Sequence, residues 1–214
     1  KGDQWFYQFT RTGTMAEYTV CSENAVICVS QDTPLDKAAL VGCGVMTGVG
    51  AVMNTAKVEA GSSVAVIGAG GVGINVVQGA TLVGAAKIIA VDVVPRKLEF
   101  ARQFGATHAV DAASDDAVDK VLELTDGEGG DYAFEIIGNP ATITQAFQML
   151  RRAGTAVIVG IPQRDAQVSL PAALFPYGER RLVGSMYGSS RMRVDMPHLL
   201  DLYRAGKLKL DELI

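Results

Sequence analysis

The stretch VAVIGAGGVG at residues 64–73 decides the fold. Its first four apolar residues are typical of a buried strand, and the glycine-rich turn after them leads directly into a helical pattern. In such a turn Gly68 permits the tight bend, Gly70 lets the backbone approach a phosphate, and Gly73 lets the helix pack closely on the strand. The N–H groups and partial positive charge of the helix start attract phosphates. The stretch therefore predicts a loop that binds the diphosphate of a dinucleotide.

An acidic residue follows this loop at the sequence spacing expected of a ribose-binding residue. Asp92 ends the next apolar run, 19 positions after Gly73, and a ribose-binding carboxylate is expected roughly 20 positions on. The charge of Asp92 would repel a 2′-phosphate, which favours NAD over NADP, while Arg96 and Lys97 nearby would soften that preference. The alternative interpretation is that Asp92 only terminates a strand as a turn residue.

From Thr55 onward, β-branched runs alternate with helical patterns at the spacing of βαβ units. The runs are continuously apolar, as strands buried on both faces require. The pattern predicts an α/β fold, a doubly wound Rossmann sheet of six parallel strands. The expected strands lie at residues 64–67, 88–92, 109–111, 132–137, 156–160 and 182–187. The expected helices lie at residues 72–82, 95–104, 116–124, 140–150 and 197–205, with a helical connection over 34–40 and 48–54.

The residues before about position 35 follow a different pattern. Residues 15–20 and 25–29 are predicted to form short antiparallel strands joined by polar turns. We therefore assign residues 1–35 to part of a second, β-rich domain and residues 36–188 to the dinucleotide-binding domain. Residues 189–214 are expected to be a helical segment returning toward the β-rich domain.

Composition limits the classes of partner. Hydrophobic residues make up 49% of the 214 residues and charged residues 20%, which is typical of a soluble globular protein. The net charge of −4 disfavours binding to nucleic acid or to an anionic membrane surface. We expect a cytoplasmic protein, because no uninterrupted apolar run approaches roughly 18 residues. The three cysteines are expected to be reduced, with Cys21 and Cys28 in a core.

At residues 42–48, GCGVMTG, the chain resembles the medium-chain, zinc-dependent alcohol dehydrogenases, especially the branch with the liver-type and formaldehyde-oxidising enzymes. The resemblance extends over essentially the whole chain. It includes MAEY at 15–18, the phosphate loop, FEIIG at 134–138, VIVGIP at 157–162 and GSMYG at 184–188. It implies an NAD-dependent oxidoreductase that transfers a hydride between an alcohol–aldehyde pair and nicotinamide with the help of zinc. It also implies that the N-terminal segment belongs to a GroES-like catalytic domain.

By this resemblance Cys43 is one of three protein ligands of a catalytic zinc, the other two being a Cys and a His of the catalytic domain. A thiolate suits zinc, which is borderline soft. Without the resemblance, an isolated cysteine is more simply a small buried hydrophobe. Thr47 is implied to lie beside the nicotinamide, so we count it with Cys43 among the catalytic residues. His108 and His198, the two histidines of the sequence, are not placed to join Cys43.

Further cofactor contacts follow from the same resemblance. Val72 is implied to lie under the pyrophosphate and nicotinamide, and Ile137 over a ribose or ring face. Backbone groups near Val159, Ser185 and Tyr187 are implied to meet the carboxamide. Taken singly, Val72, Ile137 and Val159 are more simply interpreted as core residues than as cofactor contacts. The predicted cofactor-binding set is Thr47, Gly68, Gly70, Gly71, Val72, Gly73, Asp92, Arg96, Lys97, Ile137, Val159, Gly160, Ser185 and Tyr187.

Several alternatives remain open. A zinc-containing sugar-alcohol dehydrogenase would share these features, whereas Cys43 and Asp92 argue against a zinc-free quinone or enoyl reductase. Outside enzymes, the alternative is a sensor that binds NAD(H). The chain lacks the family's upstream metal-binding stretch and four-cysteine lobe, so we expect it to be a central portion that is inactive alone. The outer strand at 182–187 predicts a homodimer paired edge to edge.

Overall fold

The computed structural model describes residues 13–214, and the chain divides into two compact units, Lys1–Thr33 and Pro34–Ile214. Residues 13–33 consist of bends and irregular segments, with one short 3-10 turn, η2 (Glu23–Ala25). The prediction of strands at 15–20 and 25–29 is therefore wrong for these residues. Met15 and Val20 are more than 95% exposed, so the segment lacks the burial and the paired neighbour that stabilise a strand.

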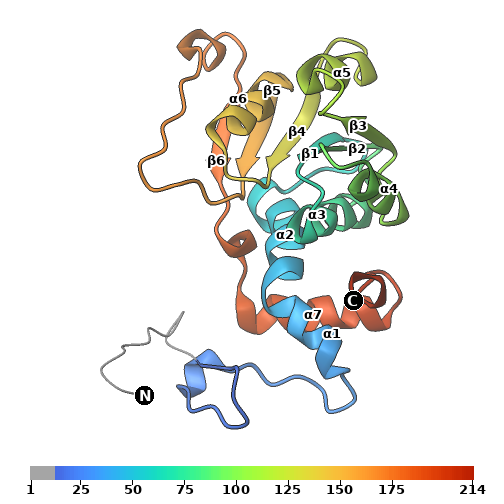
Figure 1. Cartoon of the computed structure of the whole chain (residues 1–214), viewed down its shortest axis with the longest axis vertical. Helices are drawn as coiled ribbons and strands as arrows, with labels where there is room; N and C mark the ends of the chain where they lie inside the picture. The colour runs from blue at the N-terminus through green and yellow to red at the C-terminus, as the bar shows by residue number, and fades with distance from the viewer. Residues whose placement is uncertain (1–12) are drawn as a thin grey trace. The chain divides into compact units, whose positions relative to one another are not determined.

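The second unit is built on six parallel strands in the order β3-β2-β1-β4-β5-β6 (Figure 1). The strand order reverses between β1 and β4, and ligands of such sheets bind outside the carboxyl ends of the strands at this point. The predicted doubly wound fold is confirmed. The strands are β1 (Ser63–Ile67), β2 (Lys87–Asp92), β3 (His108–Asp111), β4 (Gly130–Glu135), β5 (Leu150–Ile158) and β6 (Arg181–Gly184).

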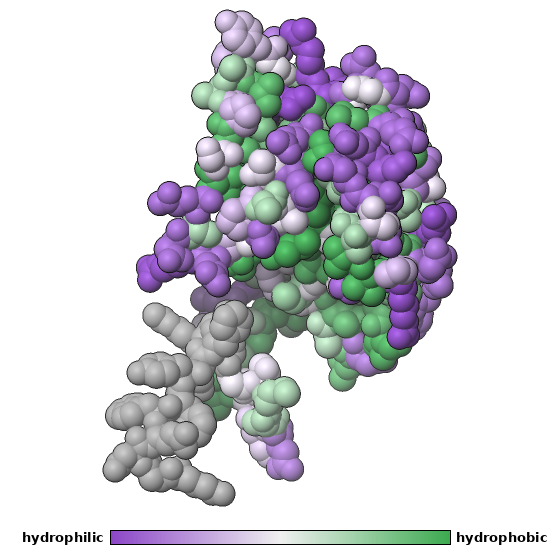
Figure 2. All heavy atoms as spheres, turned by 45° about the horizontal axis from the view of Figure 1, so that its top comes forward, coloured by the Kyte–Doolittle hydropathy of each residue, from purple (hydrophilic) through white to green (hydrophobic). Residues whose placement is uncertain are grey.

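Helices cover both faces of the sheet (Figure 1). Side chains alternate along each strand, so Val64 and Val66 of β1 lie in one hydrophobic cluster and Ala65 and Ile67 in the other. The first cluster is completed by α3 and α4, and the second by α5 and α6. In Figure 2 hydrophilic side chains surround narrower hydrophobic areas, as expected where helices bury one face. These helices are α3 (Gly71–Leu82), α4 (Pro95–Gln103), α5 (Ala117–Leu124) and α6 (Pro140–Gln148).

A continuous helical segment, Leu35–Ala56, leads into the sheet and confirms the predicted helical connection. It is long and apolar enough to span a membrane by length and composition. Its apolar side chains have partners within the unit, since Val41, Val45, Met46 and Val49 cluster with leucines of the C-terminal segment. The segment comprises α1 (Leu35–Leu40), π-helical η3 (Val41–Val45), α2 (Met46–Gly50) and π-helical η4 (Ala51–Ala56).

Several element boundaries differ from the expectation, and β4, for example, spans Gly130–Glu135 rather than 132–137. The last helix, α7 (Met192–Arg204), begins before Pro197 because the Asp195 carboxylate accepts the Arg191 N–H at its start, at 2.7 Å. Strand β6 ends at Gly184 rather than 187, since Tyr187 is left-handed with φ +54°. Strand β5 begins at Leu150, where it pairs with Gly130 ahead of a β-bulge. The remaining short turns are η5 (Ala172–Leu174), η6 (Tyr187–Ser189) and η7 (Asp211–Leu213).

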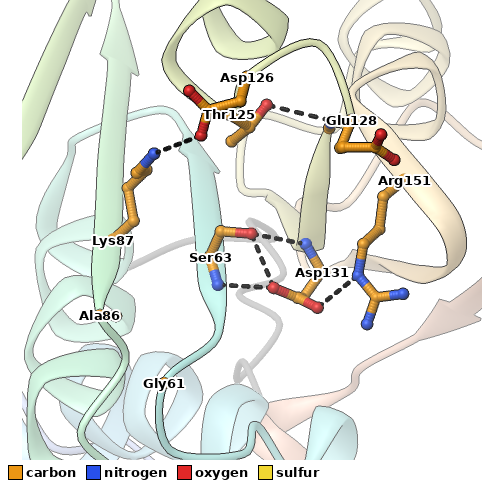
Figure 3. A pocket seen from close by; sticks show the side chains of 10 residues that line it. Gly61, Ser63, Ala86, Lys87, Thr125, Asp126, Glu128, Asp131 and Arg151 are labelled. Carbon is orange, nitrogen blue, oxygen red and sulfur yellow. Dashed lines mark hydrogen bonds and ion pairs between the residues drawn. The ribbon is translucent and has the colours of Figure 1, made fainter.

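A polar cluster closes the amino-terminal edge of the sheet (Figure 3). The Asp131 carboxylate accepts the N–H and the hydroxyl of Ser63, both at 2.7 Å, and pairs with the guanidinium of Arg151. Desolvation raises the pKa of Asp131, but the bonds from Ser63 and Arg151 lower it more, so the pKa lies below its ordinary value of 3.8. These residues line a hollow of about 300 Å³ at the edge opposite the carboxyl ends of the strands. Their charges are engaged in tying β1 to β4.

We predict that Asp131→Asn lowers the free energy of unfolding by about 1–3 kcal/mol at pH 7, because charge-assisted bonds to a main-chain N–H and to Arg151 are lost. The contribution of a carboxylate with a lowered pKa is complete above about pH 4 and disappears as the pH falls through the folded-state pKa. Urea titrations of both proteins from pH 7 downward measure the difference. As a control, Glu128→Gln alters an exposed carboxylate of the same hollow and should cost less than about 0.5 kcal/mol. A difference independent of pH would contradict the assignment.

Candidate functional site

The phosphate loop has the geometry of an anion site. Gly68 leaves β1 with φ +99°, a conformation that favours glycine. Gly70 is the N-cap of α3, and no side chain caps this helix start. A Cβ atom built on Gly70 or Gly71 would meet no atom within 4 Å. The first N–H groups of α3 therefore have no side-chain cap, and an uncapped helix start of this kind attracts phosphates.

Two glycines allow main chains to approach one another beneath this loop. A Cβ on Gly73 would collide with the carbonyl oxygen of Gly68, so the helix lies directly against the turn. A Cβ on Gly48 of α2 would lie 2.5 Å from the carbonyl oxygen of Val72. This contact brings α2, and with it the half-buried Thr47, beside the helix start.

Asp92 connects the end of β2 to the phosphate loop. The carboxylate is 8% exposed. One oxygen accepts the N–H of Ala69 at 2.8 Å, and the other accepts the N–H of Val94 at 3.0 Å. Lys97 lies 3.7 Å from the carboxylate, and Arg96 beside it is exposed on the first turn of α4. A carboxylate has about four acceptor positions, so Asp92 keeps capacity for ribose hydroxyls after these bonds.

The loops after β4 and β5 contact each other at the carboxyl edge of the sheet. Ile137 is 55% exposed and lies against Gly68, where a Cβ would be 3.0 Å from the Ile137 side chain. Val159 is buried, and the N–H groups of Val159 and Gly160 bond to the carbonyl of Glu135 at 2.8 and 3.0 Å. The structure thus brings the sequence-predicted residues of three loops to one edge of the sheet.

Ser185 and Tyr187 follow β6. The Ser185 hydroxyl is buried and lies 2.8 Å from the Thr55 hydroxyl, and the Ser185 N–H donates to the carbonyl of Ile158 at 2.8 Å. The Tyr187 hydroxyl donates to the carbonyl of Gly42, beside Cys43. Burial raises the pKa of Tyr187, and repulsion from Cys43 raises it further. The segment after β6 is thereby joined to the helical segment that carries Cys43 and Thr47.

The cysteines and histidines do not form a metal centre within residues 13–214, where no three His, Cys, Asp or Glu side chains converge. Cys43 is exposed in the π-helical η3 and supplies one thiol. A protein zinc site needs three or four ligands, so the described residues do not complete one. Cys21 and Cys28 are also exposed, so their expected core position is wrong. His108 bonds to Thr107 at the start of β3, and His198 is exposed on α7.

Sequence reasoning missed two residues that organise the site. Glu135 is fully buried at the end of β4, and its carboxylate accepts main-chain N–H groups of the next turn. Thr55 orients Ser185. A charged residue inside the apolar run of β4 was the available signal for Glu135, because a carboxylate is rarely buried unless it is satisfied. No sequence signal pointed to Thr55.

The residues at the carboxyl edge fit a dinucleotide. An uncapped helix start suits a diphosphate, a buried carboxylate with acceptor positions left over suits hydroxyl donors, and exposed Ile137 adds an apolar surface against Gly68 at the same edge.

Three comparisons bear on this arrangement. S-(hydroxymethyl)glutathione dehydrogenase from Saccharomyces cerevisiae is 39% identical over 220 residues, covering 100% of this chain and 56% of the relative. The structure of benzyl alcohol dehydrogenase from Acinetobacter calcoaceticus superposes with a TM-score of 0.91 at 35% identity, covering 94% of this chain and 56% of that one. A zinc-binding dehydrogenase from Sinorhizobium meliloti, in a structure bound to NADP, has a TM-score of 0.76 at 26% identity and covers 84% of this chain and 52% of that one.

The chain spans about half the length of the curated relatives that it matches. The family described as zinc-binding dehydrogenase matches residues 71–205, more than half of the chain. With the sheet order, the phosphate loop and the acidic residue after β2 in place, this match shows that the chain belongs to the zinc-binding dehydrogenase family.

Proposed function

We propose that this chain is the cofactor-binding part of an NAD-dependent oxidoreductase that transfers a hydride between an alcohol–aldehyde pair and nicotinamide. The observation that carries the proposal is the hydrogen bond from the Ala69 N–H to the Asp92 carboxylate, which holds a buried carboxylate beside an uncapped helix start. We propose that this carboxylate binds the adenosine ribose. When bound, NAD supplies the hydride acceptor. The chain's own residues bind it, orient its nicotinamide and exclude water from the reacting face.

The two halves of the cofactor have different partners in this proposal. Gly68, Gly70, Gly71 and Gly73 admit the diphosphate to the N–H groups of α3, and Asp92 accepts the adenosine ribose hydroxyls, with Arg96 and Lys97 beside it. The nicotinamide half is bound at the far end of the same edge. Its proposed partners are Thr47, Val72, Val159, Ser185 and Tyr187. Ile137 is proposed to pack on a ribose or ring face of the cofactor, and Gly160 belongs to the same cofactor-binding set.

NAD is proposed over NADP. A family member of known structure binds NADP, so membership alone does not fix the cofactor. The buried carboxylate of Asp92 does discriminate, because a 2′-phosphate would place a second negative charge against it. Lys97 is 48% exposed and only 3.7 Å away, so it offsets part of this repulsion.

Cys43 is the proposed zinc ligand of this chain. The family's description as zinc-binding dehydrogenases supports a zinc ion in the whole protein. Because residues 13–214 complete no zinc site, the other ligands come from outside them. We propose accordingly that the 214 residues bind cofactor but do not oxidise alcohols alone.

The substrate class rests on relatives whose names specify S-(hydroxymethyl)glutathione and benzyl alcohol. We propose that the substrate is a small alcohol or aldehyde, a class that includes sugar alcohols. An NAD(H)-binding sensor is the alternative outside enzymes. The whole protein would decide between them, because a sensor binds NADH but exchanges no hydride with any alcohol or aldehyde.

The domain organisation and location are proposed on the same basis. Residues 1–35 belong to the β-rich catalytic domain, residues 36–188 form the dinucleotide-binding domain, and residues 189–214 return toward the catalytic domain. A cytoplasmic location agrees with the packing of the apolar side chains of Leu35–Ala56 inside the unit.

A homodimer through the edge of β6 is also proposed. β6 is the last strand of the sheet, and its outer edge has no partner strand within residues 13–214. Leu182 is 37% exposed and Met186, just after the strand, is 75% exposed. An unpaired edge with apolar neighbours favours pairing with its own copy about a two-fold axis.

We predict that Asp92→Asn reverses much of the cofactor preference. Loss of the charge weakens the bond to ribose and removes the repulsion of a 2′-phosphate, so the ratio of NADH to NADPH affinity should fall at least about tenfold. Fluorescence titration of each reduced cofactor measures this ratio. Asp131→Asn at the opposite edge should leave the ratio unchanged. If Asp92→Asn changes both affinities equally, the role of Asp92 in cofactor choice is wrong.

We predict that the chain sediments as a dimer at micromolar concentration. Leu182→Asp should raise the dissociation constant at least about tenfold, because the new carboxylates of two copies would face each other across the axis. Val194→Asp changes an exposed apolar residue on α7, away from the β6 edge, and should leave the dimer intact. Analytical ultracentrifugation that finds only monomer for the unmodified chain rules out this pairing.

A further inference from the structure

We infer that Tyr187 is a positioning residue for the Cys43 thiol, because its hydroxyl fixes the helical turn on which Cys43 stands. This inference rests on the proposed function, in which Cys43 is a zinc ligand. It adds to that function the residue that sets the orientation of this ligand. A metal site of fixed geometry depends on ligand side chains that neighbouring groups already hold in place.

The Tyr187 side chain joins the segment after β6 to the helical segment that carries Cys43. Its hydroxyl donates to the carbonyl oxygen of Gly42, the residue directly before Cys43, although the two partners are 145 positions apart in the chain. The ring packs against the hydrophobic cluster that the helical segment forms with leucines of the C-terminal segment. Tyr187 therefore contacts both the main chain and the apolar side chains around Cys43.

The turn that Tyr187 contacts has an unusual conformation. Cys43 lies at the centre of η3, a π-helical stretch between the α-helical stretches α1 and α2. Val41 and Val45 at its two ends are buried, whereas Cys43 is exposed. Single π-helical turns are rare and are frequent at functional sites. A hydroxyl that binds a carbonyl of this turn stabilises a conformation that the adjoining α-helices do not impose.

The main chain that carries the Tyr187 ring is itself strained. Tyr187, Gly188 and Ser189 have φ values of +54°, +67° and +48° in succession. Left-handed backbone is unfavourable for residues with a Cβ atom, and it persists where surrounding contacts hold it, often at functional sites. A Cβ on Gly188 would lie 2.4 Å from the carbonyl oxygen of Met46. The strained turn thus lies directly against the helical segment just after η3.

Two side chains of η4 hold this strained turn. The Asn54 amide donates to the carbonyl oxygen of Gly188 at 3.2 Å. The Thr55 hydroxyl lies 2.8 Å from the hydroxyls of both Ser185 and Ser189. The turn is therefore bonded to one helical segment at two places, at η4 through these side chains and at η3 through the Tyr187 hydroxyl.

Another side of the same segment is fixed independently. A Cβ on Gly48 of α2 would lie 2.5 Å from the carbonyl oxygen of Val72, so α2 lies against the start of α3. Without the Tyr187 hydroxyl, α2 keeps this contact and η3 loses its bond to the segment after β6. The effect of losing the hydroxyl should consequently be confined to η3 and to the Cys43 thiol.

The test measures the main chain of η3 and the thiol separately on the 214-residue chain. We expect Tyr187→Phe to speed amide hydrogen exchange in residues 43–46 about three- to tenfold, the scale of one net hydrogen bond. Exchange at the buried Leu199 and Leu200 of α7, in the same hydrophobic cluster, should stay unchanged. With Cys21→Ser and Cys28→Ser, Cys43 is the single cysteine and can carry a trifluoromethyl tag. In Tyr187→Phe its fluorine resonance should move toward that of the tagged chain unfolded in urea.

Tyr203→Phe is the matched control. The Tyr203 hydroxyl bonds to the Asp211 carboxylate at 3.1 and 3.2 Å, and its ring packs against the same cluster, so its loss should leave η3 and the fluorine resonance unchanged. Thr55→Val loosens the strained turn without contacting η3 and should speed exchange in residues 43–46 about twofold.

An equal rise in exchange at α7 and η3 in Tyr187→Phe, or no rise at η3, means that Tyr187 is only a structural residue and the inference is wrong. If Tyr187→Phe does not fold, unchanged exchange at η3 in Thr55→Val overturns the inference instead. Titration of the unmodified chain with NADH tests the proposed function separately. Absence of NADH binding would remove that function, whereas the effect of Tyr187 on η3 is measured without any cofactor.

Discussion

The hydrogen bond from the Ala69 N–H to the Asp92 carboxylate is the contact on which the proposed site depends. The loops at the carboxyl edge of a parallel sheet are not ordered by the hydrogen bonds between the strands. Other contacts must fix their conformation if they are to bind a ligand. Asp92 holds the phosphate loop to the end of β2, and Glu135 holds the turn after β4 to the loop after β5. Buried carboxylates bonded to main-chain N–H groups thus fix the phosphate loop and the turn after β4 at the same edge of the sheet. Asp131 does the same at the opposite edge, where it ties β1 to β4.

Most of the fold was predictable because its sequence signals are local and strong. The buried strands are continuous apolar runs, and Pro95 and Pro140 stand at the starts of helices as the pattern indicated. The glycines of residues 64–73 require close main-chain approaches that few other arrangements satisfy, and the structure shows the approach of Gly73 to Gly68. Asp92 was found by its spacing alone. These features depend on neighbours within a single βαβ unit.

The features that the sequence did not predict depend on contacts between residues far apart in the chain, which a local sequence pattern does not encode. The strands expected at 15–20 and 25–29 need a paired neighbour, and the sequence pattern alone could not show that these residues are exposed. The bonds from Glu135 join residues of two loops, and the contact of Tyr187 with Gly42 joins positions 145 apart in the chain. Cys43 was recognised through resemblance, and among residues 13–214 no three His, Cys, Asp or Glu side chains converge to hold a metal. Family membership and geometry therefore support different parts of the account: the first supports zinc, and the second supports the dinucleotide.

The most direct test of the central claim is a crystal structure of the chain grown with NADH. The account predicts the diphosphate at the start of α3 and the adenosine ribose hydroxyls within hydrogen-bond distance of the Asp92 carboxylate. Cofactor density at the amino edge, in the hollow beside Asp131, would contradict it. So would cofactor at the carboxyl edge whose ribose makes no contact with Asp92.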